Sequence, residues 1–511
     1  MSFLPHTPPL GPSQTSSSSE GLKGLFSWLP TTDKAQKAIP IREERILSSI
    51  EAVDEVFSRL QPDTHVALQG LDSDKGCKGY RRSRNGWVRI TIEGEEYLVN
   101  TRLPFTKNMD LGRYPVRFIV ENAYDSSSTL ARLGINRAVH CLETAKKLTS
   151  KFSSLPQTVL KSDCNVIDAI RALWRTMDKS QHQWYALLCK VRPFLANISP
   201  FRVNTAHYGS ILDSWRDNES QKGKVSEWEA MLKEYGDSFP VILKPDSAVT
   251  GRFTMSSPAL HSMDRELRNA FFANKDMTLI SGDYHQMQPR LVAEEAKDAD
   301  FRKIFEEGRD LYKVWASIFY EKPEDQVSSS ERQSFKAVSL AWLYGMQTDN
   351  LVSTIIENAL TYNLDGAMTE ERARAGLNSF CNRFSKLTQW KATLGRVSLD
   401  RGYVVTRFGR KIPFRDRAYR ATCFWAQGTE VELMLRLVET LGNQLKKKLP
   451  RSRIKLFMHD ELILETPKEE TMHAAELLKT TMNDTFQLCL PNAPLSNLLD
   501  IHISDCWGSL K

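Results

Sequence analysis

The stretch IKLFMHDELILE, residues 454–465, decides the fold of this chain. Its two apolar segments flank His459, Asp460 and Glu461, which is the pattern of a β-hairpin with a charged tip. Charged residues rarely lie in such apolar surroundings unless they are paired or bind a metal. The hairpin therefore indicates a carboxylate site at its turn. The simpler interpretation, that the charges only close the turn, stays open when this stretch is taken alone.

A second apolar run, far away in the chain, also ends in an aspartate. Residues 277–283 read MTLISGD, a short strand that ends at Asp283. Two strand-end aspartates can converge in one sheet, where Asp283 and Asp460 would hold two magnesium ions. Magnesium prefers oxygen ligands and commonly takes one or two carboxylates together with substrate phosphates. Two ions about 4 Å apart would stabilise the attacking and leaving oxygens of a phosphoryl transfer.

A cationic helix is predicted between these two strands, over residues 331–345 (ERQSFKAVSLAWLYG). Steps of four residues turn a helix by only about 40°, so one broad face holds four candidate residues. These are Arg332, Lys336, Leu340 and Tyr344. The arginine fork and the lysine charge could hold neighbouring phosphates of a triphosphate, and the tyrosine could stack on a base. Gly345 predicts the end of the helix. A solvated face is the alternative for the cationic pair alone.

Composition limits the class of protein. The 511 residues are 41% hydrophobic and 26% charged, which excludes global disorder. No stretch approaches about 18 consecutive apolar residues, so no membrane association is expected. Eight cysteines without a CxxC pair argue against a structural zinc site and are consistent with a reducing compartment. An intracellular, cytoplasmic protein is expected. The net charge of +7 permits nucleic-acid binding without showing it.

The N-terminal part of the sequence is less informative. Residues 1–40 are expected to be a disordered leader rich in proline and serine. An α+β unit is predicted for residues 41–150, with helical spacing over 43–60 and a hairpin over 87–99 that turns at Glu93-Gly94. Residues 150–240 are predicted to be mainly helical. Two basic clusters could contact a nucleic-acid backbone or be solvated loops: Arg81, Arg82 and Arg84 near Trp87, and KKKLPRSR at 446–453.

From about Pro245 onward, the chain resembles the family A DNA polymerases, which include bacterial DNA polymerase I and phage replicative polymerases. Six motifs in the family's order carry the resemblance: AVTGRF (248–253), LRNAF (267–271), GDYHQMQPR (282–290), R-x3-K-x7-YG (332–345), AQGTEVE (426–432) and MHDELILE (458–465). The fold implied is a multidomain α+β, right-hand polymerase whose palm is an antiparallel sheet with helical fingers and thumb. Its implied parts are a thumb-like region (151–240), the palm (241–295 and 396–511) and the fingers (296–395), which follow the α+β domain of unknown role predicted for 41–150.

The resemblance also implies roles for single residues in template-directed DNA synthesis. Asp283 and Asp460 would hold two Mg²⁺ ions, with the Tyr284 carbonyl as a further ligand. Arg332 and Lys336 would bind the phosphates of the incoming dNTP, and Lys336 could protonate pyrophosphate. The primer–template and nucleotide contacts implied are as follows: Tyr344 beside the templating pair, Arg252 and Gln427 in the minor groove, and His459 and Glu461 at the primer terminus and the metal site.

Several positions depart from the family pattern and alter the nucleotide pocket. Gln288 replaces the usual glutamate that crowds the 2′ position of the sugar, so exclusion by bulk should survive while a charge-dependent tether to Tyr344 weakens. Leu340 stands where Phe or Tyr is usual, and Tyr312 where a phosphate-contacting histidine is common. Pro289 and Cys423 replace the usual leucine and asparagine. These changes affect sugar selectivity more than the type of reaction.

A proofreading exonuclease is not expected in this chain. Its first signature is a D-x-E on a strand, and residues 41–160 contain none on a predicted strand; Asp54-Glu55 falls on a predicted helix. A separate exonuclease or a processivity factor is therefore a candidate partner. The compact layout favours a phage-type enzyme, acting in replication, repair or lesion bypass in the host cytoplasm. The alternatives are a single-subunit RNA polymerase, a sugar-tolerant polymerase and a non-catalytic DNA-binding scaffold.

Overall fold

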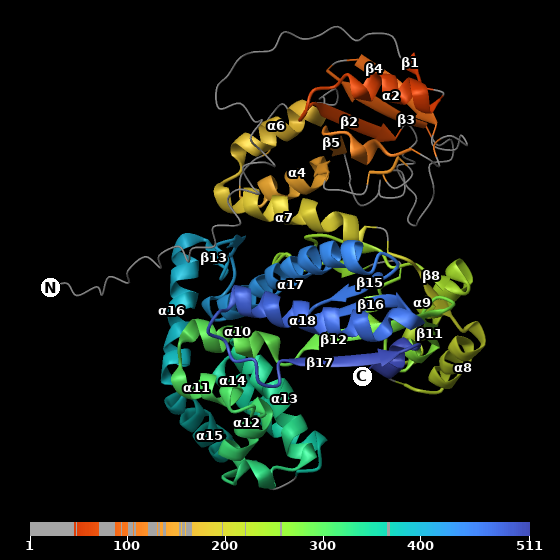
Figure 1. The fold of residues 1–511 in the computed structure, drawn as a ribbon. Coiled ribbons are helices and arrows are strands. Elements are labelled where there is room, and N and C mark those ends of the chain that lie inside the picture. The colour runs from red at the N-terminus through yellow and green to blue at the C-terminus, as the bar shows by residue number, and fades with distance from the viewer. Residues whose placement is uncertain are drawn as a thin grey trace, which may run out of the picture.

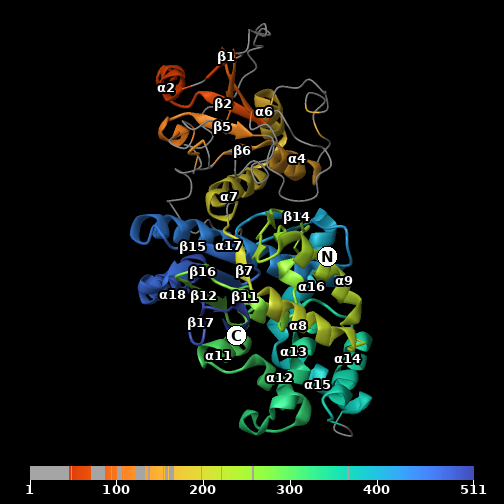
Figure 2. The ribbon, with the colours of Figure 1, turned by 90° about the vertical axis from the view of Figure 1, so that its right-hand side faces the viewer.

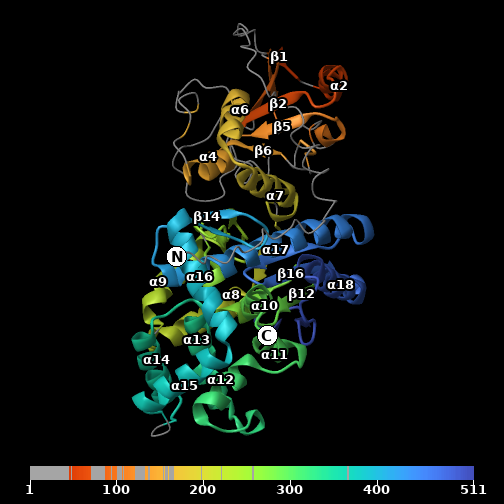
Figure 3. The same cartoon turned by 90° about the vertical axis from the view of Figure 1, so that its left-hand side faces the viewer.

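A computed structural model of the chain describes residues 45–47, 49–70, 87–93, 95–100, 106, 109–120, 130, 133–135, 139–152, 155, 159, 166–196, 198–219, 221–255, 258–364 and 368–510. Figure 1 shows a six-stranded sheet at one end of the molecule, a four-stranded sheet in the middle and a group of helices at the other end. Figures 2 and 3 show the same order along the long axis. The predicted leader and the basic cluster at Arg81, Arg82 and Arg84 lie outside the described residues.

The N-terminal sheet has the strand order β1-β4-β3-β2-β5-β6. Its strands are β1 (Arg45–Ile46), β2 (His65–Gly70), β3 (Trp87–Ile92), β4 (Glu95–Asn100), β5 (Arg117–Val120) and β6 (His140–Cys141). Antiparallel pairing joins β2, β3 and β4, whereas β5 runs parallel to both β2 and β6. The hairpin predicted over 87–99 is confirmed by the β3–β4 pair.

The helix expected over 43–60 is shorter than predicted. Residues Arg45–Ile46 form β1, which pairs in parallel with β4. The helix α2 (Ile50–Ser58) begins only after Ser49, whose hydroxyl oxygen accepts a hydrogen bond from the Ala52 amide at 3.2 Å. A serine in this position ends the extended segment, because its side chain satisfies an amide that the first helical turn leaves open.

Helices dominate the next part of the chain, as predicted for residues 150–240. They are α4 (Leu142–Ser150), α6 (Val166–Thr176), α7 (Lys179–Leu195), α8 (Thr205–Arg216) and α9 (Lys222–Tyr235), with short strands β7 (Phe201–Val203) and β8 (Ser238–Phe239) between them. A capping box of Asp178 and Gln181 starts α7. This helix lies between the N-terminal sheet and the rest of the molecule (Figure 1).

The central antiparallel sheet has the order β15-β16-β12-β17. Its strands are β12 (Met277–Tyr284), β15 (Arg453–Met458), β16 (Glu461–Pro467) and β17 (Leu499–Ser504). The helix α18 (Thr471–Cys489) covers one face so closely that a Cβ at Gly282 would lie 2.5 Å from the Met482 sulfur. The long helix α17 (Ala421–Lys448) packs beside α18, and α8 lies on the other side of the sheet in Figures 2 and 3.

Between β12 and α17 the chain forms a helical group around stacked aromatic rings. The helices are α10 (Met287–Ala296), α11 (Ala299–Glu306), α12 (Leu311–Tyr320), α13 (Ser329–Leu343), α14 (Thr348–Thr361), α15 (Glu370–Arg383) and α16 (Ser385–Arg401). The Trp315 and Phe380 ring centroids are 3.6 Å apart, which ties α12 to α15. Two-residue strands β9 (Leu243–Lys244) and β10 (Thr254–Met255) and the hairpin β13–β14 (Tyr403–Val405 and Lys411–Pro413) complete the part relevant to the site.

None of the described helices has both the length and the apolar character that crossing a membrane would require.

Candidate active site

The two predicted aspartates come together where β12 meets the β15–β16 turn. His459 has a φ of 53°, the left-handed conformation that lets the chain turn back between the strands, and Asp460 follows it. The Tyr284 amide donates a hydrogen bond to the Asp460 carbonyl at 3.2 Å, so Asp460 lies beside the end of the strand that carries Asp283. The hairpin and the convergence of the two strands, both predicted from the sequence, are confirmed.

A row of three carboxylates crosses the sheet at this end. Asp283 is in register with Glu461 of β16 and with Asp500 of β17. Residues in register on neighbouring antiparallel strands point to the same face, with Cβ atoms about 5 Å apart. The Glu461 Oε1 atom accepts a hydrogen bond from the Ser281 hydroxyl at 2.6 Å, which fixes that carboxylate. Asp500 was not predicted; its signal is the polar–apolar alternation of DIHIS at 500–504.

The donor set at this place fits magnesium. Its atoms are carboxylate oxygens of Asp283 and Asp460 and the backbone carbonyl of Tyr284, all hard oxygen donors. Within the described part of the chain, no three His, Cys, Asp or Glu side chains are grouped so as to hold a metal ion by themselves. Two carboxylates completed by substrate phosphates are the arrangement that magnesium commonly adopts.

The helix α13 presents the predicted cationic face. Ser328 and Glu331 form a capping box at its start, and the face opposite the site is buried through Phe335, Val338 and Trp342. Arg332, Lys336, Leu340 and Tyr344 are all at least partly accessible. At Gly345, φ is +89° and a Cβ would lie 1.9 Å from the Tyr419 carbonyl oxygen, so only glycine fits there. The predicted helix and its end are confirmed.

Arg332 is oriented by groups from a neighbouring helix. Its Nε atom donates to Asp310 Oδ2 at 2.7 Å, and its guanidinium carbon lies 5.3 Å from the centre of the Tyr312 ring. Asp310 also caps α12, where it accepts from the amides of Tyr312 and Lys313. Burial raises the pKa of Tyr312 to about 12, so this residue stays a neutral hydrogen-bond donor at physiological pH. Asp310 was not predicted; it lies two residues before the predicted Tyr312.

Gln288 and Tyr344 are linked through a buried carboxylate that the sequence did not single out. The Tyr344 hydroxyl donates to Gln288 Oε1, and Gln288 Nε2 donates to Glu430. Arg252, from the loop between β9 and β10, donates to Glu430 Oε1 from Nε at 3.1 Å and from Nη2 at 2.7 Å. The neutral amide of Gln288 keeps a hydrogen bond to Tyr344, and the weakening of this tether relative to a glutamate stays a prediction.

Electrostatics around Glu430 are set by burial and by Arg252. Burial raises the pKa of Glu430, and the charge and hydrogen bonds of Arg252 oppose that shift. The pKa of Tyr344 is also raised, chiefly by burial, so its hydroxyl remains a donor. Glu430 lies inside the quoted motif AQGTEVE, and its only sequence signal is an acid in a mostly apolar helical segment.

Gln427 lies one helical turn before Glu430 on α17. Its Oε1 atom accepts from the Thr250 hydroxyl at 3.4 Å, and its Nε2 donates to Cys423 Sγ at 3.2 Å. The loop that carries Arg252 and the helix that carries Gln427 are therefore in contact, as expected if both were to face one DNA groove. A thiol sulfur is a weak hydrogen-bond acceptor, so Cys423 holds the Gln427 amide only weakly.

Comparison with known proteins places the chain in a family. Residues 209–509, more than half of the chain, match the family model described as DNA polymerase family A. The chain belongs to DNA polymerase family A. Membership agrees with the six ordered motifs and with the contact between the end of β12 and the β15–β16 turn.

Relatives of this family A chain include bacterial DNA polymerases I. It is 27% identical to DNA polymerase I of Aquifex aeolicus over 444 residues, covering 84% of this chain and 73% of that protein. It is also 27% identical to the thermostable DNA polymerase I of Thermus aquaticus over 333 residues, 59% of this chain and 38% of the Thermus protein. The chain thus spans well under half of the length of the Thermus relative.

A solved structure shares the fold. It is the POL domain of Pol1 from M. smegmatis in complex with DNA primer-template and dNTP, with a TM-score of 0.72, 16% sequence identity, and coverage of 92% of this chain and 100% of that chain. The mixed helical and sheet architecture of a family A polymerase domain is therefore present here.

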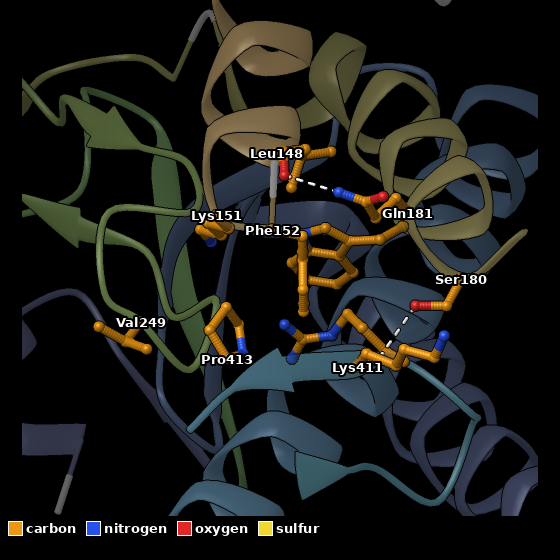
Figure 4. Close-up of a pocket in the computed structure, with 10 residues that line it drawn as sticks. Leu148, Lys151, Phe152, Ser180, Gln181, Val249, Lys411 and Pro413 are labelled. Atoms are coloured by element: carbon orange, nitrogen blue, oxygen red, sulfur yellow. Dashed lines mark hydrogen bonds between the residues drawn. The ribbon is translucent and has the colours of Figure 1, made fainter. Parts of the chain in front are cut away.

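A small cavity of this family A chain lies away from the carboxylates, between α4, α7 and the β13–β14 hairpin (Figure 4). Each of its three cations is paired with a carboxylate: Lys151 with Asp246 at 2.7 Å, Lys411 with Asp178 at 2.8 Å, and Arg410 with Glu432 at 3.0 Å. Figure 4 also shows the hydrogen bonds from Gln181 to Leu148 and from the Lys411 backbone to Ser180 that close its walls. This cavity has no part in the site described above.

Proposed function

We propose that this chain is a template-directed DNA polymerase that adds dNTPs to a primer 3′-OH and releases pyrophosphate. The observation that carries the proposal is the meeting of Asp283 and Asp460 at the palm sheet, joined to the cationic face of α13 through the Gln288–Tyr344 hydrogen bond. Family membership and the primer-template and dNTP in the related solved structure support the same reaction and partners.

The chemistry assigns each side chain a task. Two Mg²⁺ ions held by Asp283, Asp460 and the Tyr284 carbonyl would stabilise charge on the attacking and leaving oxygens. Arg332 and Lys336 bind the triphosphate, and the primer 3′ oxygen attacks the α-phosphorus as the bond to pyrophosphate breaks. Lys336 can give a proton to the leaving pyrophosphate. Arg252, Gln427, His459 and Glu461 position the primer end.

The division into palm, fingers and thumb is part of this proposal. Residues 241–295 and 396–511, with the central sheet, α17 and α18, would be the palm, residues 296–395 the fingers, and residues 151–240 the thumb. The cluster KKKLPRSR would contribute little to DNA binding through Arg451, because that side chain pairs with Glu470 at 2.7 Å and with Glu469 at 2.9 Å. The two last lysines of α17 remain candidates for a backbone contact.

Primer extension tests the function. A purified chain with Mg²⁺, a defined primer–template and either dNTPs or rNTPs should extend the primer with dNTPs, and Asp283→Ala should abolish extension while DNA is still bound. Comparable extension with rNTPs would favour an RNA-making or sugar-tolerant polymerase. DNA binding without any extension by the wild-type chain would favour a scaffold.

Leu340→Tyr should increase the incorporation of dideoxynucleotides. Leu340 lies one turn before Tyr344 on the accessible face of α13, where it would contact the sugar of a bound nucleotide. A dideoxynucleotide lacks the 3′-hydroxyl group. The hydroxyl group of a tyrosine at position 340 would supply a polar contact in its place. The ratio of terminated to extended product in a sequencing-type reaction measures the effect, and an unchanged ratio would refute it.

We also propose that the chain lacks a 3′–5′ exonuclease. The strand β2 (HVALQG) has no carboxylate, and two of the three acids of α2 are paired: Asp54 accepts from Arg113 and Tyr114, and Glu55 from Arg59. A 3′-mismatched primer incubated with the chain and Mg²⁺, without dNTPs, should keep its length while a proofreading polymerase shortens it in parallel. Shortening by this chain that EDTA stops would contradict the proposal.

A further inference from the structure

Four polar side chains form a hydrogen-bonded chain with a defined direction. The Tyr344 hydroxyl donates to the carbonyl oxygen of Gln288, and the amide nitrogen of Gln288 donates to Glu430 Oε2. Arg252 donates twice to the other oxygen of Glu430, at 3.1 and 2.7 Å. The chain links α13, the first turn of α10, the helix α17 and the β9–β10 loop.

This direction requires an amide at position 288. A glutamate there could accept from Tyr344 but could not donate to Glu430, and two neighbouring carboxylates would repel each other. Gln288 can satisfy both partners only with its amide nitrogen toward Glu430, so its side chain is held in one orientation. The amide at position 288 and the carboxylate at position 430 are therefore complementary as hydrogen-bond donor and acceptor.

The Glu430 carboxylate is buried, so water cannot take the place of its hydrogen-bond partners. It is 1% exposed, and both of its oxygens are used by Gln288 and Arg252. Removing the carboxylate would leave the Arg252 charge and the Gln288 amide without an acceptor in a partly buried place, which loosens both. The position of Gln288 thus depends on Glu430.

Gln288 lies where a nucleotide sugar would be placed. The phosphates of a nucleotide bound to Arg332 and Lys336 would end at Asp283 and Asp460, and its base would lie near Tyr344. The sugar joins these two ends. Gln288 is hydrogen-bonded to Tyr344 on one side and to Glu430 on the other, and Glu430 is close enough to Asp283 for that carboxylate to raise its pKa. A fixed side chain at this point can exclude an extra hydroxyl group by bulk.

We propose that Glu430 is the specificity-determining residue that sets deoxyribose over ribose in this chain. It acts as a positioning residue, by holding Gln288 in the orientation that blocks a 2′-hydroxyl and by holding Arg252 beside it. The inference rests on the proposed polymerase function and deepens it, since it concerns which nucleotides the same site accepts.

The test is a charge exchange between positions 288 and 430. Single-nucleotide incorporation with dCTP and with CTP gives kcat/KM for each, and their ratio is the discrimination. Glu430→Gln should lower this ratio by about tenfold or more, because Gln288 loses a charged acceptor.

Gln288→Glu should lower the melting temperature and the rate with dCTP, because two carboxylates then meet. The double variant Gln288→Glu/Glu430→Gln restores every hydrogen bond with the roles reversed, and should recover discrimination to within about threefold of wild type.

The matched control is Glu432→Gln. Glu432 lies on the same helix, is 4% exposed and pairs with an arginine, Arg410, at 3.0 Å, but it is not bonded to Gln288. This variant should lower the melting temperature and leave the ratio unchanged. A folded Glu430→Gln chain that extends with dCTP and keeps the wild-type ratio would overturn the inference alone. A wild-type chain that extends no primer would overturn the proposed function, and the inference with it.

Discussion

Primer extension by an Asp460→Asn variant is expected to fall by about 10³-fold or more while the chain stays folded. Asp460 lies in the turn between β15 and β16, tied by its backbone to Tyr284, so the amide changes charge and not shape. Charge stabilisation by a bound metal supplies several kcal/mol to a phosphoryl transfer, and each 1.36 kcal/mol corresponds to a factor of ten in rate. Loss of one of two carboxylates should remove most of that stabilisation.

The matched control for Asp460 is Asp505→Asn. Asp505 follows β17 and pairs with Lys468 at 2.7 Å on the surface, so its replacement should leave the rate within about twofold. Primer–template affinity measured in EDTA separates DNA binding from metal binding and should be unchanged in Asp460→Asn. Extension by Asp460→Asn within tenfold of wild type would show that the strand-end carboxylates are not the catalytic site.

Arg332→Ala is expected to lower kcat/KM for dNTPs by about 10²-fold, mainly through KM. The guanidinium is already held in place by Asp310 at 2.7 Å and by the Tyr312 ring at 5.3 Å, so a phosphate meets a preformed donor. A hydrogen bond to a charged group contributes about 1.5–3 kcal/mol, which corresponds to about 10- to 10²-fold. Steady-state incorporation of a single dNTP measures the effect.

Arg309→Ala is a close control for Arg332→Ala. The Arg309 side chain is 28% exposed, against 30% for Arg332, and it also pairs with an acid of the helical group, Glu324. Because it does not lie on the accessible face of α13, its loss should change kcat/KM by less than about threefold. Arg332→Lys should fall between, since lysine keeps the charge and loses the planar fork. Equal losses in Arg309→Ala and Arg332→Ala would indicate a general stability effect and contradict the phosphate role.

Local elements with a strong pattern were predicted well. The β15–β16 hairpin, the strand ending at Asp283 and the helix α13 follow from apolar periodicity and from turn or capping residues within a few positions. The start of α2 was not predicted, because β1 exists only through its pairing with β4, about 50 residues later. Propensity alone favours a longer helix there, and long-range pairing overrides it.

The structure brings Asp460 beside the end of the Asp283 strand and links Tyr344, Gln288 and Arg252 through Glu430, while the roles of the predicted site residues stay predictions. Three acidic residues in these contacts were not predicted. Asp310, Glu430 and Asp500 each look ordinary in sequence, since an acid near a helix start, inside a helix or on a strand is common. Only the packing shows their neighbours: Asp310 pairs with Arg332, Glu430 is bonded to Gln288 and Arg252, and Asp500 is in register with Asp283. Such contacts depend on how separate elements pack.

By itself the sequence determined the order of the motifs, the main helices and strands around the site, and the residue types that could bind metal and phosphate. These features are local, because the side-chain periodicity of helices and strands and the residue preferences of turns act over a few residues. Only the tertiary structure decided which charged side chains form ion pairs with each other. Arg252 and Glu430 lie 178 positions apart, and Arg332 and Asp310 lie 22 apart. Their pairing requires buried partners brought together by the packing of the β9–β10 loop on α17 and of α12 on α13, which no local pattern specifies.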